Sequence, residues 1–306
     1  MPDKGRSVFL DYDQAALDAA YDQAAYAPNR EQLISRRIAE SEAARRRIGE
    51  PERVVYGPGA VEQLDIYRTT RTGAPVFIFI HGGAWRSGRS KDFATPAEVF
   101  IAAGAHYIVP DFAWVQDVDG SLMVLADQVR RAVAWIYRHA SDFGGDPNRL
   151  YLAGQSSGGH LAAVAMTTDW QRGFGLPADI IKGGMCISGM YDLTPVRLSA
   201  RNRYVAFDDA TVAALSPIRH LDRLAAPLIV AYGTCETPEF QRQSHEFAGA
   251  VEGVGRLAQL LVGEHYNHFE LPETLANPYG LLGRAALDLM GLAQPITGPT
   301  RFRGKR

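Results

Sequence analysis

Residues 150–166 read LYLAGQSSGGHLAAVAM, and this stretch decides the fold. Its first residues are apolar, Gly-Gln-Ser-Ser-Gly follows, and a helix-forming segment completes it. The order strand, tight turn and helix presents a serine hydroxyl above a sheet edge, at the N-terminus of the following helix. Such a turn needs small residues two before and two after the serine, here Gly154 and Gly158. Because only Ser156 is centred between them, Ser156 rather than Ser157 is the predicted nucleophile.

Other apolar runs are spaced along the rest of the chain, at 75–80, 106–109, 185–187, 228–232 and 257–262. Continuous apolar runs of this kind are typical of strands buried on both faces of a parallel sheet. Helical patterns lie between them, and the clearest places apolar residues on one helix face over 122–136. This alternation predicts an α/β fold with a mostly parallel central sheet flanked by helices.

The chain divides into three parts. Residues 1–50 are polar and mostly helical in pattern, and they predict an N-terminal helical cap. Residues 51–296 begin with short extended segments at 53–56 and 63–67 and are expected to form one catalytic domain. A basic C-terminal tail follows at residues 297–306. The length of 306 residues suits one large α/β domain with a lid.

Composition excludes several classes of partner. The net charge is −2 and no basic stripe dominates, so we expect no nucleic-acid partner. No apolar run approaches the roughly 20 residues of a membrane-spanning helix, so no membrane partner is expected. Cys186 and Cys235 lack C-x-x-C spacing, and residues 1–13 lack the apolar core of a signal peptide, which predicts a cytoplasmic setting. We expect a small-molecule substrate and leave a homodimer open.

A second motif, HGGAW, follows the first long apolar run. Its glycines let backbone N–H groups turn inward toward a substrate oxygen. The amides of Gly82, Gly83 and Ala84, with the amide of Ser157, are therefore predicted to form an oxyanion hole. The side chain of Trp85 forms either a pocket wall or core packing, and the sequence leaves both open.

The acid and the base should follow late strands, because the chain order in such sites is serine, acid, histidine. Glu236 comes soon after the run at 228–232, whereas Glu239 falls in the first turn of the next expected helix, where a carboxylate favours the helix dipole. Glu236 is therefore the predicted acid. His265 and His268 both follow the last run, and spacing alone does not decide which is the base.

The same two histidines form an H-x-x-H pair, which raises the alternative of a metal site. A catalytic zinc needs three protein ligands, and no third ligand cluster accompanies the pair. We therefore expect no metal and no cofactor.

Together these residues resemble the arylformamidases, which are kynurenine formamidases of the α/β-hydrolase type, and the broader carboxylesterase and hormone-sensitive-lipase-like group. The resemblance covers most of the chain and includes both the serine turn and HGGAW. Its other segments are LDIY at 64–67, SGMYDLTP at 188–195, ETPEF at 236–240 and HFE at 268–270. It implies an α/β-hydrolase fold with an N-terminal helical lid.

The resemblance places the family's acid on Glu236 and its histidine on His268, which precedes a phenylalanine. The family usually has Asp where Glu236 and Asn267 stand, and Ala where Ser157 stands. A glutamate still reaches an imidazole, so we expect the fold and the triad to survive these changes. Relatives that share one fold often differ in the substrate on which they act.

The resemblance also implies that residues 12–49 and 190–215 cover the pocket as a lid. Tyr191 and Asn202 in the second segment, together with Trp85, are then expected to contact substrate. Other residues of that segment either face a substrate carboxylate or belong to an ordinary solvated loop: Arg197, Arg201 and Arg203.

These expectations combine into a serine hydrolase that cleaves a small-acyl amide through an acyl-enzyme with a Ser-His-Glu triad. The substrate class is an N-formyl or N-acyl aryl or enamide compound. The alternative within the same class is a carboxylesterase of the hormone-sensitive-lipase-like group. A non-catalytic binding protein on the same fold is a further alternative, and the presence of Ser156, Glu236 and His268 argues against it.

Overall fold

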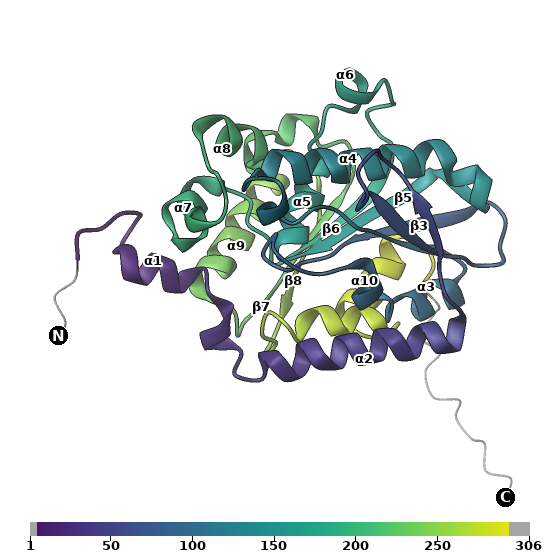
Figure 1. Cartoon of the computed structure of the whole chain (residues 1–306), viewed down its shortest axis with the longest axis horizontal. Coiled ribbons are helices and arrows are strands. Elements are labelled where there is room, and N and C mark those ends of the chain that lie inside the picture. The colour runs from purple at the N-terminus through teal and green to yellow at the C-terminus, as the bar shows by residue number, and fades with distance from the viewer. Residues whose placement is uncertain (1–4, 294–306) are drawn as a thin grey trace, which may run out of the picture.

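The structure is a computed structural model that describes residues 5–293. One eight-stranded sheet runs through the molecule (Figure 1). Its strands lie in the order β1-β2-β4-β3-β5-β6-β7-β8. The strands are β1 (Glu52–Val55), β2 (Gln63–Tyr67), β3 (Ala74–Ile80), β4 (His106–Pro110), β5 (Gly145–Gln155), β6 (Ile181–Ile187), β7 (Leu228–Gly233) and β8 (Leu257–Gly263). β1, β2 and β4 pair antiparallel at one edge, and all other pairings are parallel, which confirms the predicted sheet. The predicted basic tail at 297–306 lies outside the described residues.

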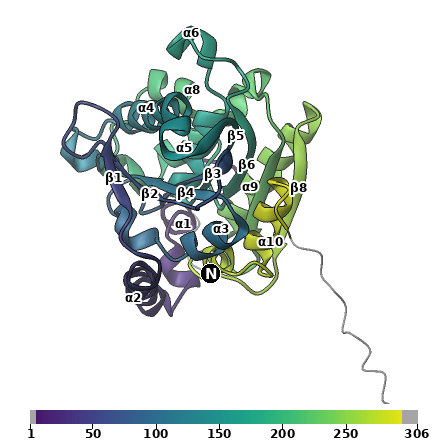
Figure 2. The same cartoon turned by 90° about the vertical axis from the view of Figure 1, so that its right-hand side faces the viewer.

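Helices cover both faces of the sheet, with α4, α5 and α9 on one face and α3 and α10 on the other (Figure 2). The helices are α1 (Gln14–Ala20), α2 (Arg30–Ile48), α3 (Ala97–Ala103), α4 (Leu122–His139), α5 (Ser157–Met166), α6 (Trp170–Phe174), α7 (Leu193–Leu198), α8 (Asp209–Leu215), α9 (Pro238–Gly253) and α10 (Leu281–Leu289). Among the short 3-10 helices are η1 (Gln23–Tyr26), η2 (Ser90–Phe93), η5 (Ala200–Arg203) and η8 (Leu271–Ala276). Within residues 5–293, none of the helices combines the length and the apolar character that crossing a membrane requires.

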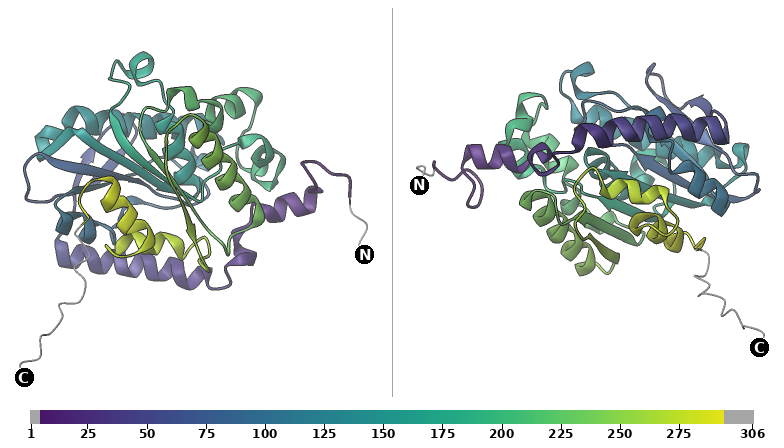
Figure 3. Two further views of the ribbon diagram at one scale, coloured as in Figure 1. Left: turned by 180° about the vertical axis from the view of Figure 1, so that it is seen from behind. Right: turned by 90° about the horizontal axis from the view of Figure 1, so that it is seen from below.

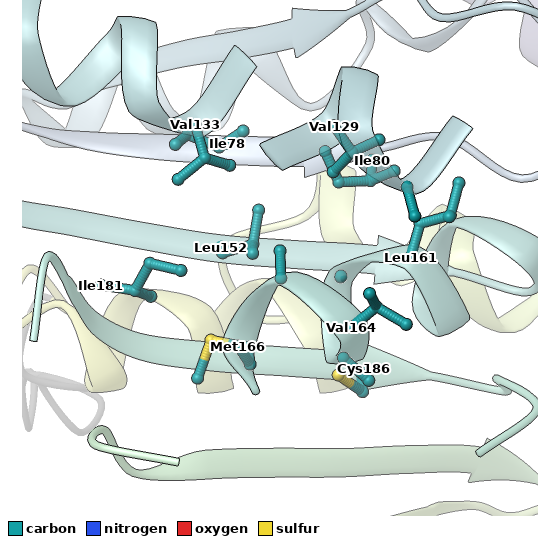
Figure 4. Close-up of a cluster of buried hydrophobic side chains, with 14 of the residues drawn as sticks. Ile78, Ile80, Val129, Val133, Leu152, Leu161, Val164, Met166, Ile181 and Cys186 are labelled. Atoms are coloured by element: carbon teal, nitrogen blue, oxygen red, sulfur yellow. The ribbon is translucent and has the colours of Figure 1, made fainter. Parts of the chain in front are cut away.

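The apolar side chains that recur along α4 pack against the sheet, as their periodic spacing in the sequence predicts. Val129 and Val133 of α4 lie over Ile78 and Ile80 of β3, and all four side chains are buried (Figure 4). Full burial of an aliphatic side chain of this size stabilises the fold by about 1.5–3 kcal/mol. The helix predicted over 122–136 is therefore confirmed as α4.

Strand register brings the predicted motifs to one edge of the sheet. Ile80, the last residue of β3, lies opposite Gly154 of β5, so HGGAW and the serine turn leave neighbouring parallel strands side by side. Gly233 of β7 likewise lies opposite Gly263 of β8, so the segments with the predicted acid and base leave at the same edge. Ligand sites of open α/β sheets form at the carboxyl ends of the strands.

The N-terminal segment folds as α1, η1 and α2, in agreement with the helical pattern over 12–49. α2 lies along the outside of the layer that contains α3 and α10 (Figure 3). The Tyr21 hydroxyl, just after α1, donates to Glu239 Oε1 at 2.9 Å, and the Thr237 hydroxyl donates to the Ala20 carbonyl at 2.7 Å. These buried contacts tie the segment to the start of α9.

Candidate active site

Ser156 occupies the sharp turn between β5 and α5. Its backbone has φ +58° and ψ −125°, a conformation that costs a residue other than glycine about 1–3 kcal/mol. Its N–H donates to the Ile187 carbonyl at 2.8 Å. A Cβ on Gly154 would lie 2.2 Å from the Gly158 carbonyl oxygen, and one on Gly158 would lie 2.1 Å from the Ile80 carbonyl oxygen. Close backbone approach therefore requires both glycines.

The structure joins the three predicted triad residues by hydrogen bonds. Ser156 Oγ lies 2.8 Å from His268 Nε2, and His268 Nδ1 lies 2.8 Å from Glu236 Oε2. All three side chains are buried. Because an ionised carboxylate only accepts hydrogen bonds, Nδ1 carries a proton and Nε2 is left to accept the serine proton. This is the tautomer in which a histidine acts as general base toward a serine.

The carboxylate of Glu236 is fully buried and held from both sides. Its Oε1 accepts hydrogen bonds from the Ser188 hydroxyl at 2.6 Å and from the Gly233 N–H at 2.7 Å, while Oε2 faces His268. These bonds compensate for the burial of a charged group and fix its orientation. Sequence reasoning missed Ser188, although its place directly after β6 was an available signal.

Glu239 and His265, the rival acid and base, lie away from the serine. Glu239 is in the first turn of α9, as expected, where it accepts from the Tyr21 hydroxyl at 2.9 Å and from Arg242 Nε at 2.7 Å. The His265 side chain is exposed, and its backbone N–H donates to the Thr234 hydroxyl at 2.8 Å. Sequence spacing did not decide between His265 and His268. In the structure, His268 contacts Ser156, whereas the His265 side chain is exposed.

The HGGAW loop is contorted and lies against the serine turn. Gly83, Ala84 and Trp85 all have positive φ, at +130°, +54° and +61°. A Cβ on Gly82 would lie 2.6 Å from Gln155 Oε1 and 2.9 Å from the Gln155 carbonyl oxygen. Positive φ in two consecutive residues other than glycine is a strain that clusters at functional sites.

In this backbone conformation, two amide N–H groups near Ser156 have no hydrogen-bond acceptor in the part of the protein that the structure describes. Within the described chain, the amides of Gly83 and Ala84 donate to no protein acceptor. Ser157 is the first residue of α5, so its N–H has no partner inside the helix. Unpaired amides beside a nucleophilic serine can bind the oxyanion of a tetrahedral intermediate.

The side chain of His81 holds the start of the HGGAW loop in place. Its Nδ1 lies 2.9 Å from the Gly82 carbonyl oxygen, and its ring stacks on Phe112 at a centroid distance of 4.4 Å. Burial lowers the pKa of His81, so the ring is neutral near pH 7. Because a carbonyl only accepts, Nδ1 carries the proton and donates it to Gly82. His81 thus acts as a structural tie.

Gln155, the residue before the nucleophile, also reaches the triad histidine. Its Nε2 donates to the His268 carbonyl at 3.1 Å and lies 3.2 Å from His268 Nε2. This amide fixes the loop that carries His268 relative to the serine turn. Gln155 stands at an unspecified position of the G-x-S-x-G motif, so no sequence signal pointed to it.

A cavity of about 280 Å³ opens beside His268. Leu33 and Arg37 of α2 form one wall, and Phe79 and Phe269 line it from β3 and from the segment after the histidine. α2 therefore covers a space that reaches the triad, as the resemblance implied for the N-terminal helices. That α2 moves as a lid stays a prediction.

Trp85, Tyr191 and Asn202, the expected substrate contacts, do not line this cavity. Trp85 is buried and packs edge-on against His160 at a centroid distance of 5.3 Å. Tyr191 is buried and stacks on Phe247 at 4.0 Å, whereas Asn202 is exposed in η5. The first two have packing positions and the third faces solvent, so their contact with substrate stays a prediction.

Known proteins share both the sequence and the fold of this chain. Residues 64–183 match the family model described as BD-FAE. Kynurenine formamidase of Danio rerio is 31% identical over 245 residues, which cover 78% of this chain and 81% of that protein. Esterase LipQ of Mycobacterium tuberculosis is 27% identical over 278 residues, which cover 81% of this chain and 63% of that protein. The structure of a proposed thioesterase from Silicibacter sp. tm1040 matches with a TM-score of 0.77 at 25% identity, covering 90% of this chain and 98% of that chain.

The strand order, the strained serine turn and the matching structures define an α/β-hydrolase. Its relatives are named as a formamidase and as esterases, and the chain is a hydrolase of amide or ester bonds. Within this class the chain belongs to the kynurenine formamidase family. The resemblance drawn from its motifs is therefore confirmed.

Proposed function

We propose that this protein hydrolyses a small-acyl amide, an N-formyl or N-acyl aryl or enamide compound, through an acyl-enzyme on Ser156. The observation that carries the proposal is the chain of hydrogen bonds from Ser156 Oγ to His268 Nε2 at 2.8 Å and from His268 Nδ1 to Glu236 Oε2 at 2.8 Å. The kynurenine formamidase of Danio rerio, 31% identical, supports a formamide as the scissile bond.

In the first half of the proposed reaction, His268 Nε2 takes the proton of Ser156 while Oγ attacks the carbonyl carbon. The amides of Gly83, Ala84 and Ser157 stabilise the negative oxygen of the tetrahedral intermediate. His268 then gives its proton to the leaving nitrogen, the C–N bond breaks, and the acyl group stays on the serine.

In the second half, His268 takes a proton from water as the water attacks the acyl ester. The proton returns to Ser156 Oγ, and the small acid leaves. Glu236 holds the imidazole in one tautomer and stabilises its positive charge in both halves. Every step uses groups of this chain, so the proposed reaction requires no cofactor.

The test compares formanilide with phenyl acetate under identical conditions. We expect turnover of both, with formanilide hydrolysed well above the background of the Ser156→Ala variant. The readouts are release of aniline and of phenol, followed as initial rates. Ester turnover with no detectable formanilide turnover contradicts the amidase proposal.

A carboxylesterase is the second candidate, and the match to esterase LipQ over 278 residues favours it. Turnover confined to the ester is the result that this candidate predicts. A binding protein that has lost catalysis predicts turnover of neither compound and no reaction of the serine with a covalent inhibitor.

A further inference from the structure

Asn29 stands directly before α2, at the position where an asparagine side chain normally caps its own helix. Within residues 5–293, its side chain makes no such capping bond to α2. Its Nδ2 instead donates to Glu270 Oε1 at 2.8 Å, and its Oδ1 accepts from Asn267 Nδ2 at 3.0 Å. Asn267 and Glu270 flank the proposed base, His268, in the sequence. The side chain at the start of α2 is therefore bonded to the loop that carries the histidine.

These three residues form a closed set of hydrogen bonds, which we call the Asn29 network (Asn29, Asn267 and Glu270). The backbone N–H of Asn267 donates to Glu270 Oε2 at 3.0 Å and completes the set. Asn267 is buried, and Asn29 and Glu270 are half-buried. Hydrogen bonds that are shielded from water are stronger than exposed ones. The network therefore fixes the position of the His268 loop relative to the start of α2.

The donors and acceptors of the network follow one direction. Asn267 Oδ1 accepts from the backbone N–H groups of Phe269 at 2.9 Å and of Glu270 at 3.1 Å. Because a backbone N–H only donates, this oxygen faces the loop, and the amide nitrogen of Asn267 is the atom that donates to Asn29. Asn29 then turns its own nitrogen toward the carboxylate of Glu270, which only accepts. Reversing one amide would place two donors or two acceptors face to face.

His268 has two other supports, and both come from the sheet domain. Its Nδ1 lies 2.8 Å from Glu236 Oε2, and its backbone carbonyl accepts from Gln155 Nε2 at 3.1 Å. The imidazole must stay within hydrogen-bond reach of Ser156 Oγ, and a displacement of about 1 Å can lower the rate roughly 10²-fold. A bond from Asn29 to the loop on either side of the imidazole therefore affects the position of the base.

We infer that Asn29 is a positioning residue for the proposed reaction, which holds His268 Nε2 beside Ser156 Oγ through Asn267 and Glu270. The start of α2 thus contributes to catalysis without touching the substrate. The inference rests on the proposed function, because it takes His268 as the base that activates Ser156. It predicts that the donor direction within the network, and not only the docking of α2, determines the turnover rate.

The first experiment removes the network with Asn29→Ala and follows the hydrolysis of phenyl acetate. We expect kcat per active site to fall about ten- to a hundredfold with KM nearly unchanged, because the base is displaced while the substrate contacts remain. Active sites are counted by complete labelling with a serine-directed phosphonate, so that unfolded protein does not enter kcat. The rate constant of this labelling should fall with kcat, which gives a readout that needs no substrate.

Arg47→Gln is the matched control for the docking of α2. Arg47 lies at the opposite end of α2 from Asn29, and its Nε and terminal nitrogen each donate to Glu98 of α3 at 2.7 Å. This pair joins the helix to the body of the protein through an exposed contact. The variant should therefore keep the wild-type kcat.

The second experiment reverses the donor direction. Asn267→Asp replaces the donor to Asn29 by an acceptor, and Glu270→Gln leaves two donors face to face, so each single variant should lower kcat about tenfold. In the double variant Asn267→Asp/Glu270→Gln, the new amide at position 270 donates to Asn29 Oδ1, and Asn29 Nδ2 donates to the new carboxylate at position 267. Every bond is then formed again in the opposite direction, so the double variant should recover most of the wild-type kcat.

Wild-type kcat per active site in Asn29→Ala overturns the inference. A double variant that is no faster than the two single variants also overturns it, and this comparison decides the matter if Asn29→Ala fails to fold. These outcomes leave the hydrolase proposal intact, because the wild-type protein still turns over its substrates. Failure of the proposed function gives a different result, which is the absence of formanilide turnover by the wild-type protein.

Discussion

Glu236 and Glu239 are fully buried carboxylates in the same segment of chain, and their partners differ. Glu236 accepts from His268, from the Ser188 hydroxyl and from a backbone amide. Glu239 instead accepts from Tyr21 and from an arginine one turn along α9. The first set of contacts orients an imidazole, whereas the second ties the N-terminal segment to the sheet domain.

Substituting each carboxylate by an amide separates these roles. Glu236→Gln is expected to lower kcat by roughly 10⁴, because the imidazole loses the acceptor that fixes its tautomer. Glu239→Gln should keep kcat and lower the free energy of unfolding by about 1–3 kcal/mol, because Arg242 and Tyr21 lose a charged acceptor. Steady-state kinetics and urea denaturation of both variants check this. A larger kcat loss in Glu239→Gln than in Glu236→Gln would contradict the assignment.

Individual residues also mark the limit of sequence reasoning. The motif and its flanking glycines were sufficient to predict Ser156, because the turn is a local structure. His265 and His268 follow the same strand, so only the path of the loop decides that His268 reaches the serine. Gln155 contacts a segment that is distant in the sequence, and no local pattern encodes such a contact.

At the scale of elements, the apolar runs predicted β3 to β8. Burial on both faces explains the apolar runs of the inner strands, whereas β8 is the edge strand and its Ala258 and Gln259 are exposed. The start of β5 was missed: residues 145–149 are mostly polar, yet Gly145 pairs with Ala74 of β3. The short helices α6, α7 and α8 had no strong periodic signal. Their positions depend on tertiary contacts, which outweigh intrinsic propensity in short helices.

The approach of the HGGAW loop to the serine turn gives a test at this scale. Gly82→Ala places a Cβ 2.9 Å from the Gln155 carbonyl oxygen, so the loop must shift. We expect kcat to fall by about 10²–10³, the effect of losing one oxyanion donor, with the fold retained in circular dichroism. Gly173→Ala is the matched control, because a Cβ there meets nothing within 4 Å. Unchanged kcat in Gly82→Ala would remove this loop from the proposed oxyanion hole.

For the whole molecule, the N-terminal segment belongs to the site. Its first helix is anchored beside Glu239, and α2 forms a wall of the cavity next to His268. The helical pattern over 12–49 predicted the helices, and only the resemblance indicated where they lie. The docking itself depends on pairs more than 200 residues apart, such as Tyr21 with Glu239, and a single sequence does not reveal such pairs.

The chemistry proposed for the whole molecule uses a serine nucleophile, and we predict that it needs no metal. Among the residues that the structure describes, no three His, Cys, Asp or Glu side chains are grouped so as to hold a metal ion. The reacting atoms of the proposed mechanism are Ser156 Oγ and His268 Nε2, which lie 2.8 Å apart. A serine-directed phosphonate reports on this pair without any assumption about the substrate.

Labelling by such a phosphonate, read by intact-protein mass spectrometry in a buffer with chelator, tests the central claim most directly. The account predicts one adduct on the wild-type protein and on Ser157→Ala, whose backbone N–H remains. It predicts no adduct on Ser156→Ala, together with a fall in kcat of about 10⁴–10⁶ for the best substrate. An adduct on Ser156→Ala, or labelling of the wild type that chelation abolishes and zinc restores, would contradict it.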